Sequence, residues 1–400
     1  SIINLSQKRM LSVFIRLLIL FALLALVKPP RLLTPLGAPQ TVQTRRPIAA
    51  MHTRFTEEAE EWKIKRGLQM LREMGVTTIV EFFPWAYYEP SKGQFDWRSA
   101  ERVIAHANQQ GLRVIARLGL PPAWAQTKRK DCRLQNTDCQ VSPTYLPNEA
   151  YVDFAEFAAA FAAHFRGWVG QVILWNEPNL SNEWGLRPVD AAGYAELVML
   201  AYPMIKHANP DVGVLIGALA PTLEPIGSAQ GLDDLIYLEQ FYEKLKLEKE
   251  KLKKASNSPF SIFHFPFYDG IAVHAYGRSA PPDESPARDR INYRRTELVR
   301  ELMLQNGDAH LPILITEAGW NDDPNWVFGV TPAQRIRYTL EAWDYAQAHW
   351  PYVQSVAMWV FKEPRPTRGY RDHFTFVTPS LEPLPIYDEV KQANQNIPLK

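Results

Sequence analysis

The sequence predicts one α/β fold, a (β/α)8 barrel of the TIM type, from three observations. Short β-rich runs alternate with longer amphipathic stretches, which is the pattern of a parallel sheet with crossover helices. Eight such runs follow one another, more than a doubly wound sheet usually contains. After the first run the chain reads His-Thr-Arg-Phe-Thr-Glu-Glu, where a doubly wound nucleotide-binding fold would have a Gly-rich phosphate loop.

The expected strands are short and apolar, as parallel strands buried on both faces should be. They are Pro47 to Thr53, Val76 to Phe83, Arg113 to Gly119, Gln171 to Asn176, Val212 to Gly217, Gly270 to His274, Pro312 to Thr316 and Ser355 to Val360. The helices expected between them have helical hydrophobic periodicity. They are Glu57 to Met74, Trp97 to Gln110, Glu149 to Phe165, Ala191 to His207, Asp289 to Gln305 and Thr331 to Ala348.

Local signals support several of these helices. Phe154, Phe157, Phe161 and Phe165 recur at three- and four-residue steps, which marks one buried helix face. Thr331 followed by Pro332 is typical of a helix start. Ahead of the sixth strand, residues 242–258 form a run rich in lysine and glutamate, which we interpret as an inserted helix with a solvated face; a binding role is the alternative.

Charge and composition narrow the class of partner. The 400 residues are 46% hydrophobic and 22% charged, which is ordinary for a globular protein. Forty-four basic and 43 acidic residues give a formal net charge of +1. This balance gives no electrostatic reason to expect a nucleic acid as partner, and a neutral, polar substrate suits it better.

Two of the expected strands end in a glutamate. The fourth run reads QVILWNEPN and places Asn176 and Glu177 at its end, and the seventh reads PILITEAGW and places Glu317 there. Catalytic side chains of a barrel project from the carboxyl ends of its strands, and strands four and seven face each other across it. Retaining cleavage of a glycoside needs two carboxyl groups about 5 Å apart, one protonated and one ionised. Either glutamate alone would more often be a surface residue, but together they predict a glycosidase site.

Several segments resemble the retaining glycoside hydrolases of clan A. The segments are EFFPWAYYEPSKGQFDW, VIARLGLPPAWA, VILWNEPN, IAVHAYG and LITEAGW, and within the clan they look most like the family 39 type, with families 5 and 42 as more distant relatives. The resemblance covers roughly Pro47 to Gln395. It implies a retaining glycosidase acting on β-linked oligo- or polysaccharides, with Glu177 as general acid/base and Glu317 as nucleophile. A covalent glycosyl-enzyme would be the intermediate.

The resemblance also implies roles for neighbouring residues. Asn176 would bind the 2-hydroxyl of the sugar, and Trp359 would form the platform beneath it. Tyr276 would hydrogen-bond the nucleophile, while His274 would line the sugar site, with a histidine packed in a polar core layer as the alternative.

One position departs from the clan pattern. Many members carry an arginine at the end of strand two, where this chain has Glu81. We expect Arg117 on the third strand to supply the positive charge that keeps Glu317 ionised, and Glu81 to pair with Arg117.

Aromatic residues just beyond strands are candidates for stacking on sugar rings. We expect Trp85, Trp124 and Trp320 to do so. Neither a metal ion nor an organic cofactor is needed for this chemistry. A glycan-binding barrel without turnover and a transglycosylase remain the alternatives, and the sequence does not distinguish hydrolysis from transfer.

The N-terminal segment predicts export. Lys8 and Arg9 precede an apolar run, Leu11 to Val27, and a Pro-rich stretch follows. We expect residues 1–28 to be a signal sequence or a membrane anchor, residues 29–46 a linker and residues 47–400 the catalytic domain. The protein would then be extracytoplasmic, secreted or held at the membrane. Cys132 and Cys139 would close a short loop as a disulfide, two free thiols being the alternative.

Overall fold

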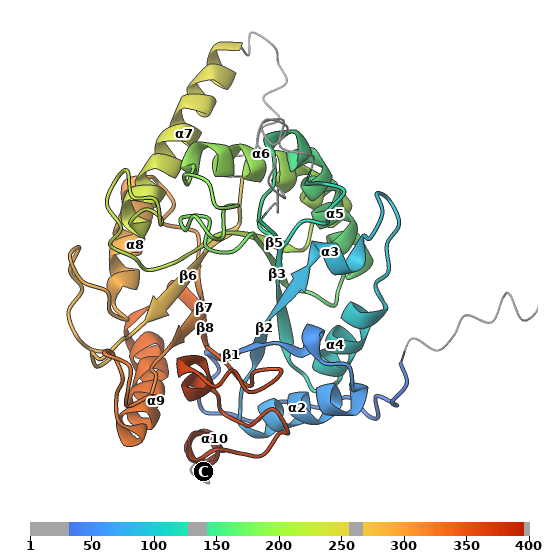
Figure 1. Ribbon diagram of the computed structural model, residues 1–400, viewed down its shortest axis with the longest axis vertical. Helices are drawn as coiled ribbons and strands as arrows, with labels where there is room; N and C mark the ends of the chain where they lie inside the picture. The colour runs from blue at the N-terminus through green and yellow to red at the C-terminus, as the bar shows by residue number, and fades with distance from the viewer. Residues whose placement is uncertain (1–31, 127–141, 256–266, 396–400) are drawn as a thin grey trace, which may run out of the picture. The chain divides into compact units, whose positions relative to one another are not determined.

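The computed structural model describes residues 32–126, 142–255 and 267–395, and it divides the chain into two units, Ser1–Pro35 and Leu36–Lys400. Eight parallel strands close into a barrel in chain order, with the last strand paired to the first (Figure 1). The strands are β1 (Ala49–Thr53), β2 (Thr78–Pro84), β3 (Arg113–Gly119), β4 (Gln171–Leu174), β5 (Gly213–Leu219), β6 (Gly270–Tyr276), β7 (Ile313–Gly319) and β8 (Val353–Met358). The predicted fold class is confirmed.

Helices surround the barrel and cover the outer faces of its strands (Figure 1). They are α2 (Glu61–Glu73), α3 (Trp85–Tyr88), α4 (Arg98–Gln109), α5 (Tyr151–His164), α6 (Ala191–Ala208), α7 (Asp234–Ala255), α8 (Arg295–Gln305), α9 (Pro332–His349) and α10 (Pro385–Gln395), with the 3₁₀ turns η1 (Phe55–Glu57), η3 (Asn148–Ala150) and η4 (Tyr370–Phe374). The six helices expected from the sequence are all present, and their ends differ from the predicted ends by a few residues.

Side chains from all eight strands fill the barrel interior. The inner cluster consists of Ala50, Val80, Ile115, Ile173, Leu215, Ala218, Ala272, Leu314 and Ala357, all at most 2% exposed. A second, larger cluster lies between strands and helices, and the phenylalanines of α5 belong to it as predicted. Because the interior is packed, the open end of the barrel is left to the polar residues at the strand ends.

Local chemistry explains the helix ends. Thr331 caps α9 through a reciprocal capping box with Gln334, and Pro332 takes the first helical position, as predicted. Gly111 follows α4 with φ +74°, and a Cβ there would lie 2.6 Å from the carbonyl oxygen of Gln40. Both the left-handed conformation and the close backbone approach therefore require glycine.

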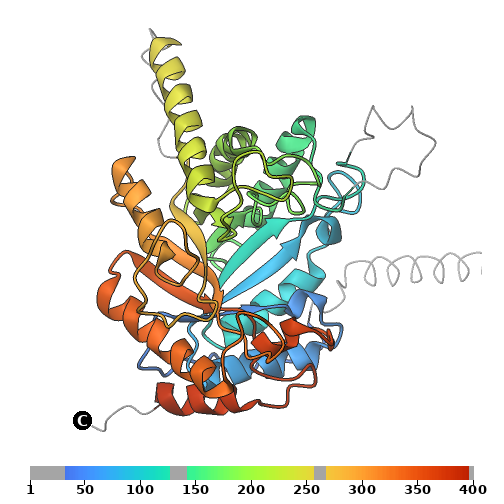
Figure 2. The same cartoon turned by 60° about the vertical axis from the view of Figure 1, so that its left-hand side comes forward.

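The charged run expected as an insertion is part of a regular helix of the barrel. α7 begins at Asp234, before the run starts, so the prediction of a separate inserted helix is wrong. Its N-terminal half is buried through Leu235, Leu238 and Phe241, whereas Leu247 is 61% exposed. Figures 1 and 2 show the C-terminal half of α7 extending beyond the neighbouring helices.

Part of the expected linker, residues 29–46, belongs to the barrel unit. Residues from Leu36 onward belong to the barrel unit. The backbone N–H of Gln40 donates to the Gln109 carbonyl (2.8 Å), and the buried Arg46 binds Asp344 (2.7 Å). The predicted signal or anchor segment and the Cys132–Cys139 loop lie outside the described residues. Within the described ranges, no helix has both the length and the apolar character needed to cross a membrane.

Candidate active site

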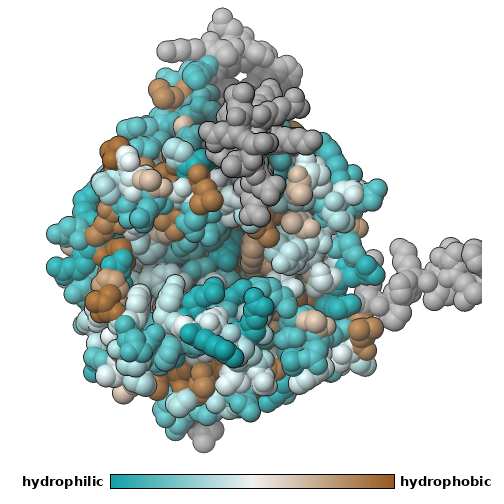
Figure 3. Space-filling model, viewed as in Figure 1, coloured by the Kyte–Doolittle hydropathy of each residue, from teal (hydrophilic) through white to brown (hydrophobic). Residues whose placement is uncertain are grey.

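A cavity of about 580 Å³ lies at the carboxyl ends of the strands. Arg117, Asn176, Glu177, Tyr276, Glu317 and Trp359, six of the residues predicted to form a site, line it together. A hollow with largely hydrophilic walls opens near the middle of the face drawn in Figure 3. Since these residues lie on β3, β6 and β7 or just after β4 and β8, only closure of the barrel brings them together.

Glu317 is held by donors on both of its oxygens. It is 6% exposed; Arg117 Nη1 donates to its Oε1 (2.5 Å) and the Tyr276 hydroxyl to its Oε2 (2.7 Å). Burial raises the pKa of Glu317, but the nearby charges of His274 and Arg117, with the hydrogen bond from Tyr276, outweigh it and lower the pKa to about 2. Glu317 is therefore an ionised carboxylate at any ordinary pH.

Glu177 lies on a strained segment of backbone. Its φ is +42° and that of Trp175 is +74°, although neither residue is glycine. Hydrogen bonds to both neighbouring strands hold this geometry: Trp175 N–H donates to the Leu118 carbonyl, and Glu177 N–H donates to the Ala218 carbonyl (3.0 Å). The strain turns the Glu177 side chain, which is 19% exposed, toward the cavity.

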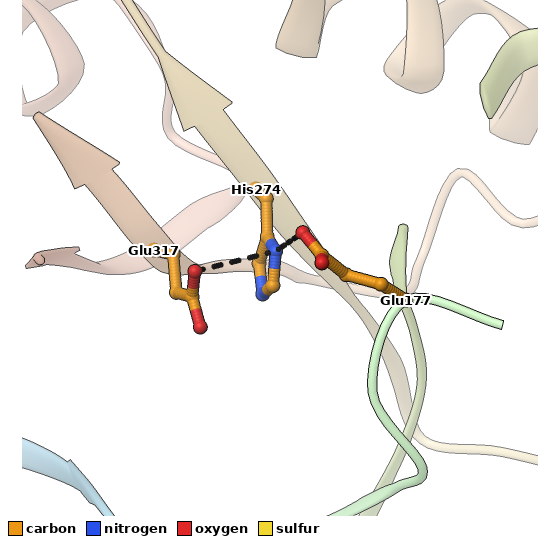
Figure 4. A group of neighbouring side chains, drawn as sticks. All are labelled: Glu177, His274 and Glu317. Carbon is orange, nitrogen blue, oxygen red and sulfur yellow. Dashed lines mark hydrogen bonds and ion pairs between the residues drawn. The ribbon is translucent and has the colours of Figure 1, made fainter. Parts of the chain in front are cut away.

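His274 lies between the two glutamates (Figure 4). Its Nδ1 is 2.8 Å from Glu177 Oε1 and 3.6 Å from Glu317 Oε2. One oxygen of each carboxylate and one ring nitrogen all lie within 4.8 Å of one another. His274 is not among the residues that line the cavity, and its side chain is fully buried, so the prediction that it lines the sugar site is wrong and the alternative of a packed polar histidine holds. The ring nevertheless contacts the acid/base candidate directly.

These three residues could in principle ligate a cation. Both oxygens of Glu317 are already occupied by the donors Arg117 and Tyr276, and a metal ion would have to compete with a guanidinium for one of them. The donor set therefore suits an ionised carboxylate held for chemistry of its own better than it suits a metal ligand.

A hydrogen-bonded chain leads away from Glu317. Arg117 Nη1 also donates to Asn176 Oδ1 (2.8 Å), and the Asn176 side chain hydrogen-bonds Glu183. Burial and the charge of Glu177 raise the pKa of Glu183, while the hydrogen bond from Asn176 opposes that rise. Asn176 is thus oriented from two sides, and the role predicted for Arg117 agrees with its position.

Neither His52 nor Glu183 was predicted from the sequence as a residue of the site. His52, at the end of β1, is fully buried, with Nε2 3.7 Å from Glu317 Oε1 and its ring 4.4 Å from that of Trp359. Burial and the charge of Arg117 hold the pKa of His52 well below its usual value, so the ring is neutral at neutral pH. A search of all strand ends would have found His52, whereas Glu183 lies in a loop without a distinctive motif.

Two predicted sugar platforms are core residues. Trp85 is fully buried against Phe157 and Trp124, and its indole N–H donates to Glu89. Trp320 is 1% exposed and packs on Gly277, where a Cβ would lie 2.1 Å from the indole ring. The predictions for Trp85 and Trp320 are therefore wrong, since neither ring offers a face to a ligand.

Two further predictions concern Trp124 and Glu81. Trp124 is partly exposed and donates to the Glu89 carbonyl, but it is not among the residues that line the cavity, so its stacking role stays a prediction.

Glu81 does not pair with Arg117: its carboxylate instead accepts hydrogen bonds from Thr53 and from the backbone of Phe55 and Thr56. It stabilises the first turn after β1.

Comparisons with known proteins match part of this chain to beta-galactosidases. The model of a family described as beta-galactosidase (glycoside hydrolase family 42) matches residues 55–145. Probable beta-galactosidase C of Sclerotinia sclerotiorum is 36% identical over 87 residues, 21% of this chain and 9% of that protein. The protein of the same name from Aspergillus fumigatus is 29% identical over 116 residues, 27% of this chain and 11% of that protein. The matched part is thus a small fraction of these relatives.

Solved structures cover nearly the whole chain. A family 39 glycoside hydrolase from Bacteroides cellulosilyticus WH2 has a TM-score of 0.65 at 18% identity, covering 90% of this chain and 66% of that one. A monomeric beta-xylosidase from Caulobacter crescentus CB15 has a TM-score of 0.58 at 19% identity, covering 88% and 69%. These similarities confirm the barrel fold. The sequence matches agree with the predicted resemblance to glycoside hydrolases.

Proposed function

We propose that this protein is a retaining glycosidase that hydrolyses β-linked glycosides by double displacement. The observation that carries the proposal is the pair Glu177 and Glu317, which have one carboxylate oxygen each within 4.8 Å. Retaining enzymes hold their carboxyl groups about 5–5.5 Å apart, whereas inverting enzymes leave room for a water molecule at about 6.5–9.5 Å.

The first step assigns a different task to each glutamate. The ionised Glu317 attacks the anomeric carbon and forms a carbon–oxygen bond, while the bond to the leaving oxygen breaks and Glu177 gives that oxygen its proton. Arg117 and Tyr276 keep Glu317 ionised and oriented before the attack. The ring of Trp359, which lines the cavity, is placed to carry the sugar.

The second step reverses the roles of acid and base. Once Glu317 is esterified, its negative charge is gone, and Glu177 takes a proton from a water molecule that attacks the same carbon. The ester bond breaks, Glu317 leaves as a carboxylate, and the sugar is released with its original anomeric configuration. His274, in contact with Glu177, is placed to hold that carboxyl group through both proton transfers.

The linkage and the cellular location belong to the proposal too. Support for a β-linked substrate comes from the relatives named beta-galactosidase and beta-xylosidase. Support for an extracytoplasmic enzyme, secreted or held at the membrane, comes from the basic and apolar N-terminal sequence. A sugar acceptor in place of water would make the same site a transglycosylase, and loss of turnover would leave a glycan-binding barrel.

Azide rescue tests the proposal directly. The wild type should hydrolyse activated aryl β-glycosides with retention, as followed by proton NMR of the product. Azide should rescue Glu317→Ala as the α-glycosyl azide and Glu177→Ala as the β-glycosyl azide, because azide replaces the nucleophile in one case and the water in the other. Glu183→Ala, which removes the third carboxylate of the cavity, is the matched control and should show no rescue.

Two results would reject the proposal. One is inversion of configuration by the wild type. The other is an absence of turnover on a broad panel of aryl β-glycosides, which would favour the glycan-binding barrel.

A further inference from the structure

A cluster of cationic and aromatic side chains borders one side of the cavity and takes no part in the proposed chemistry. We call it the rim cluster; it consists of Arg278, Trp326, Phe328, Tyr370 and Arg371. Arg278 follows β6, Trp326 and Phe328 follow β7, and Tyr370 and Arg371 lie in η4 after β8. All except Phe328 line the cavity. The rim cluster therefore follows β6, β7 and β8, whereas Glu177 follows β4.

The aromatic rings of the rim cluster contact one another, and one of them also contacts Arg278. Trp326 stacks on Tyr370 (ring centroids 5.8 Å apart, planes at 24°) and contacts Phe328 edge-on (5.4 Å). The guanidinium of Arg278 lies over the Phe328 ring at 4.4 Å, which fixes its position without using its N–H groups.

Neither arginine is bound directly by any carboxylate that the structure describes, although the charge of Arg371 lowers the pKa of the Glu363 carboxyl group. Among the described residues, neither Arg278 nor Arg371 has an ion pair or a side-chain hydrogen bond. Burial alone lowers the pKa of the half-buried Arg278, so no carboxylate compensates for its desolvation. Arg278 also has φ +52°, a conformation that costs free energy in a non-glycine residue and is found at ligand sites.

Three acidic residues of these loops are already engaged. Asp322 binds Arg335 and His373, and Asp372 accepts hydrogen bonds from Thr367 and from the backbone of Arg368. Glu363 pairs with Arg54. Both arginines line the cavity, and neither is bound directly to one of these three carboxylates.

We propose that the rim cluster binds an oxyanion carried by the glycan, so that the substrates of this enzyme are acidic saccharides bearing a carboxylate or a sulfate group. Guanidinium groups match the planar, bidentate geometry of such anions, and the adjacent rings can stack on the face of the same sugar. The proposal rests on the glycosidase function proposed above and adds the chemical class of its substrate.

The test separates binding from turnover. Isothermal titration with the Glu177→Gln variant would compare a panel of β-linked acidic polysaccharides, chondroitin sulfate among them, with their desulfated and carboxyl-reduced forms. We expect the acidic forms to bind at least about tenfold more tightly than the neutral forms. Hydrogen bonds between charged groups contribute more binding free energy than hydrogen bonds between neutral groups. Loss of the preference on desulfation identifies sulfate as the group bound, and loss on carboxyl reduction identifies carboxylate.

Variants of the two arginines assign the effect to the rim cluster. Arg278→Gln combined with Arg371→Gln should abolish the preference for acidic forms, and Arg371→Gln alone, at an exposed position, should weaken it without endangering the fold. Arg368→Gln is the matched control, since Arg368 is an exposed arginine of the same loop that does not line the cavity.

Equal binding of acidic and neutral forms across the panel, or a preference that survives the double variant, would overturn the inference. Because binding is measured without turnover, a wild type that hydrolyses no aryl glycoside yet keeps the arginine-dependent preference would reject the glycosidase proposal alone.

Discussion

Glu317 and Glu177 are the same residue type in one cavity, yet their surroundings differ in three respects. The Glu317 side chain is 8% exposed and that of Glu177 is 19% exposed. Glu317 accepts hydrogen bonds from Arg117 and Tyr276 on separate oxygens, while the hydrogen-bond partner of Glu177 among the described residues is His274. Glu317 lies within β7, whereas Glu177 lies beyond the end of β4 with positive φ.

This difference shows that the surroundings determine the role of each carboxyl group. A nucleophile must be ionised and fixed in place, and the two donors on Glu317 satisfy both needs. An acid/base residue must gain and lose a proton during each cycle, so a more open position with one titratable partner suits it. The strained backbone at Glu177 costs stability and directs that side chain to the leaving group.

The largest expected effect comes from amide substitution of the two glutamates. Glu317→Gln should lower kcat/KM on the order of 10⁴-fold or more on every substrate, since no covalent intermediate can form. Glu177→Gln should cost about 10²- to 10⁴-fold on poor leaving groups and much less on dinitrophenolate, which leaves without a proton. Rates for a series of aryl glycosides measure this contrast. The same leaving-group dependence in both variants would mean that the two environments do not separate the roles.

Loss of Arg117 should have the next largest effect. Arg117→Gln removes a charge that lowers the pKa of Glu317, so that pKa rises from about 2 toward its ordinary value. The nucleophile is then protonated at higher pH, and the acidic limb of the kcat/KM profile moves upward. We expect a fall of about 10²- to 10³-fold near the optimum, as for removal of one preorganised donor.

Arg113→Gln is the matched control for Arg117, because Arg113 is an exposed arginine at the opposite end of the same strand. An acidic limb that stays in place in Arg117→Gln would show that His274 and Tyr276 are sufficient to keep Glu317 ionised.

Much of this arrangement could be predicted because apolar runs locate parallel strands and barrel geometry locates catalytic residues at their ends. Glu177 and Glu317 were predicted in this way. The contact between His274 and both glutamates could not be predicted from the sequence, because it depends on a register shift between β6 and β7 at Val273 and His274. Sequence spacing does not reveal such a shift.

The tryptophans show a second limit. Trp85, Trp320 and Trp359 all follow strands closely, and sequence position does not tell which way each ring turns. Trp85 begins α3 and turns outward to the phenylalanines of α5, and Trp320 fills the space left by Gly277. Trp359 lines the cavity. The directions depend on packing between elements that are distant in the sequence.

The smallest expected effect concerns Tyr276, whose hydroxyl donates to the carboxylate of Glu317. Formation of the glycosyl-enzyme removes the charge that this hydrogen bond stabilises, and hydrolysis restores it. Tyr276→Phe should therefore slow the second step more than the first, lowering kcat about tenfold.

The covalent intermediate should then accumulate in Tyr276→Phe. It would be detected as a burst of dinitrophenolate and as an added sugar mass on the protein. Tyr202→Phe, which removes a hydroxyl bound to Asp269 outside the cavity, should give no burst. A Tyr276→Phe variant slowed equally in both steps would mean that Tyr276 serves to position Glu317 and does not stabilise its charge, which would leave Arg117 and His274 as the groups that set the two glutamates apart.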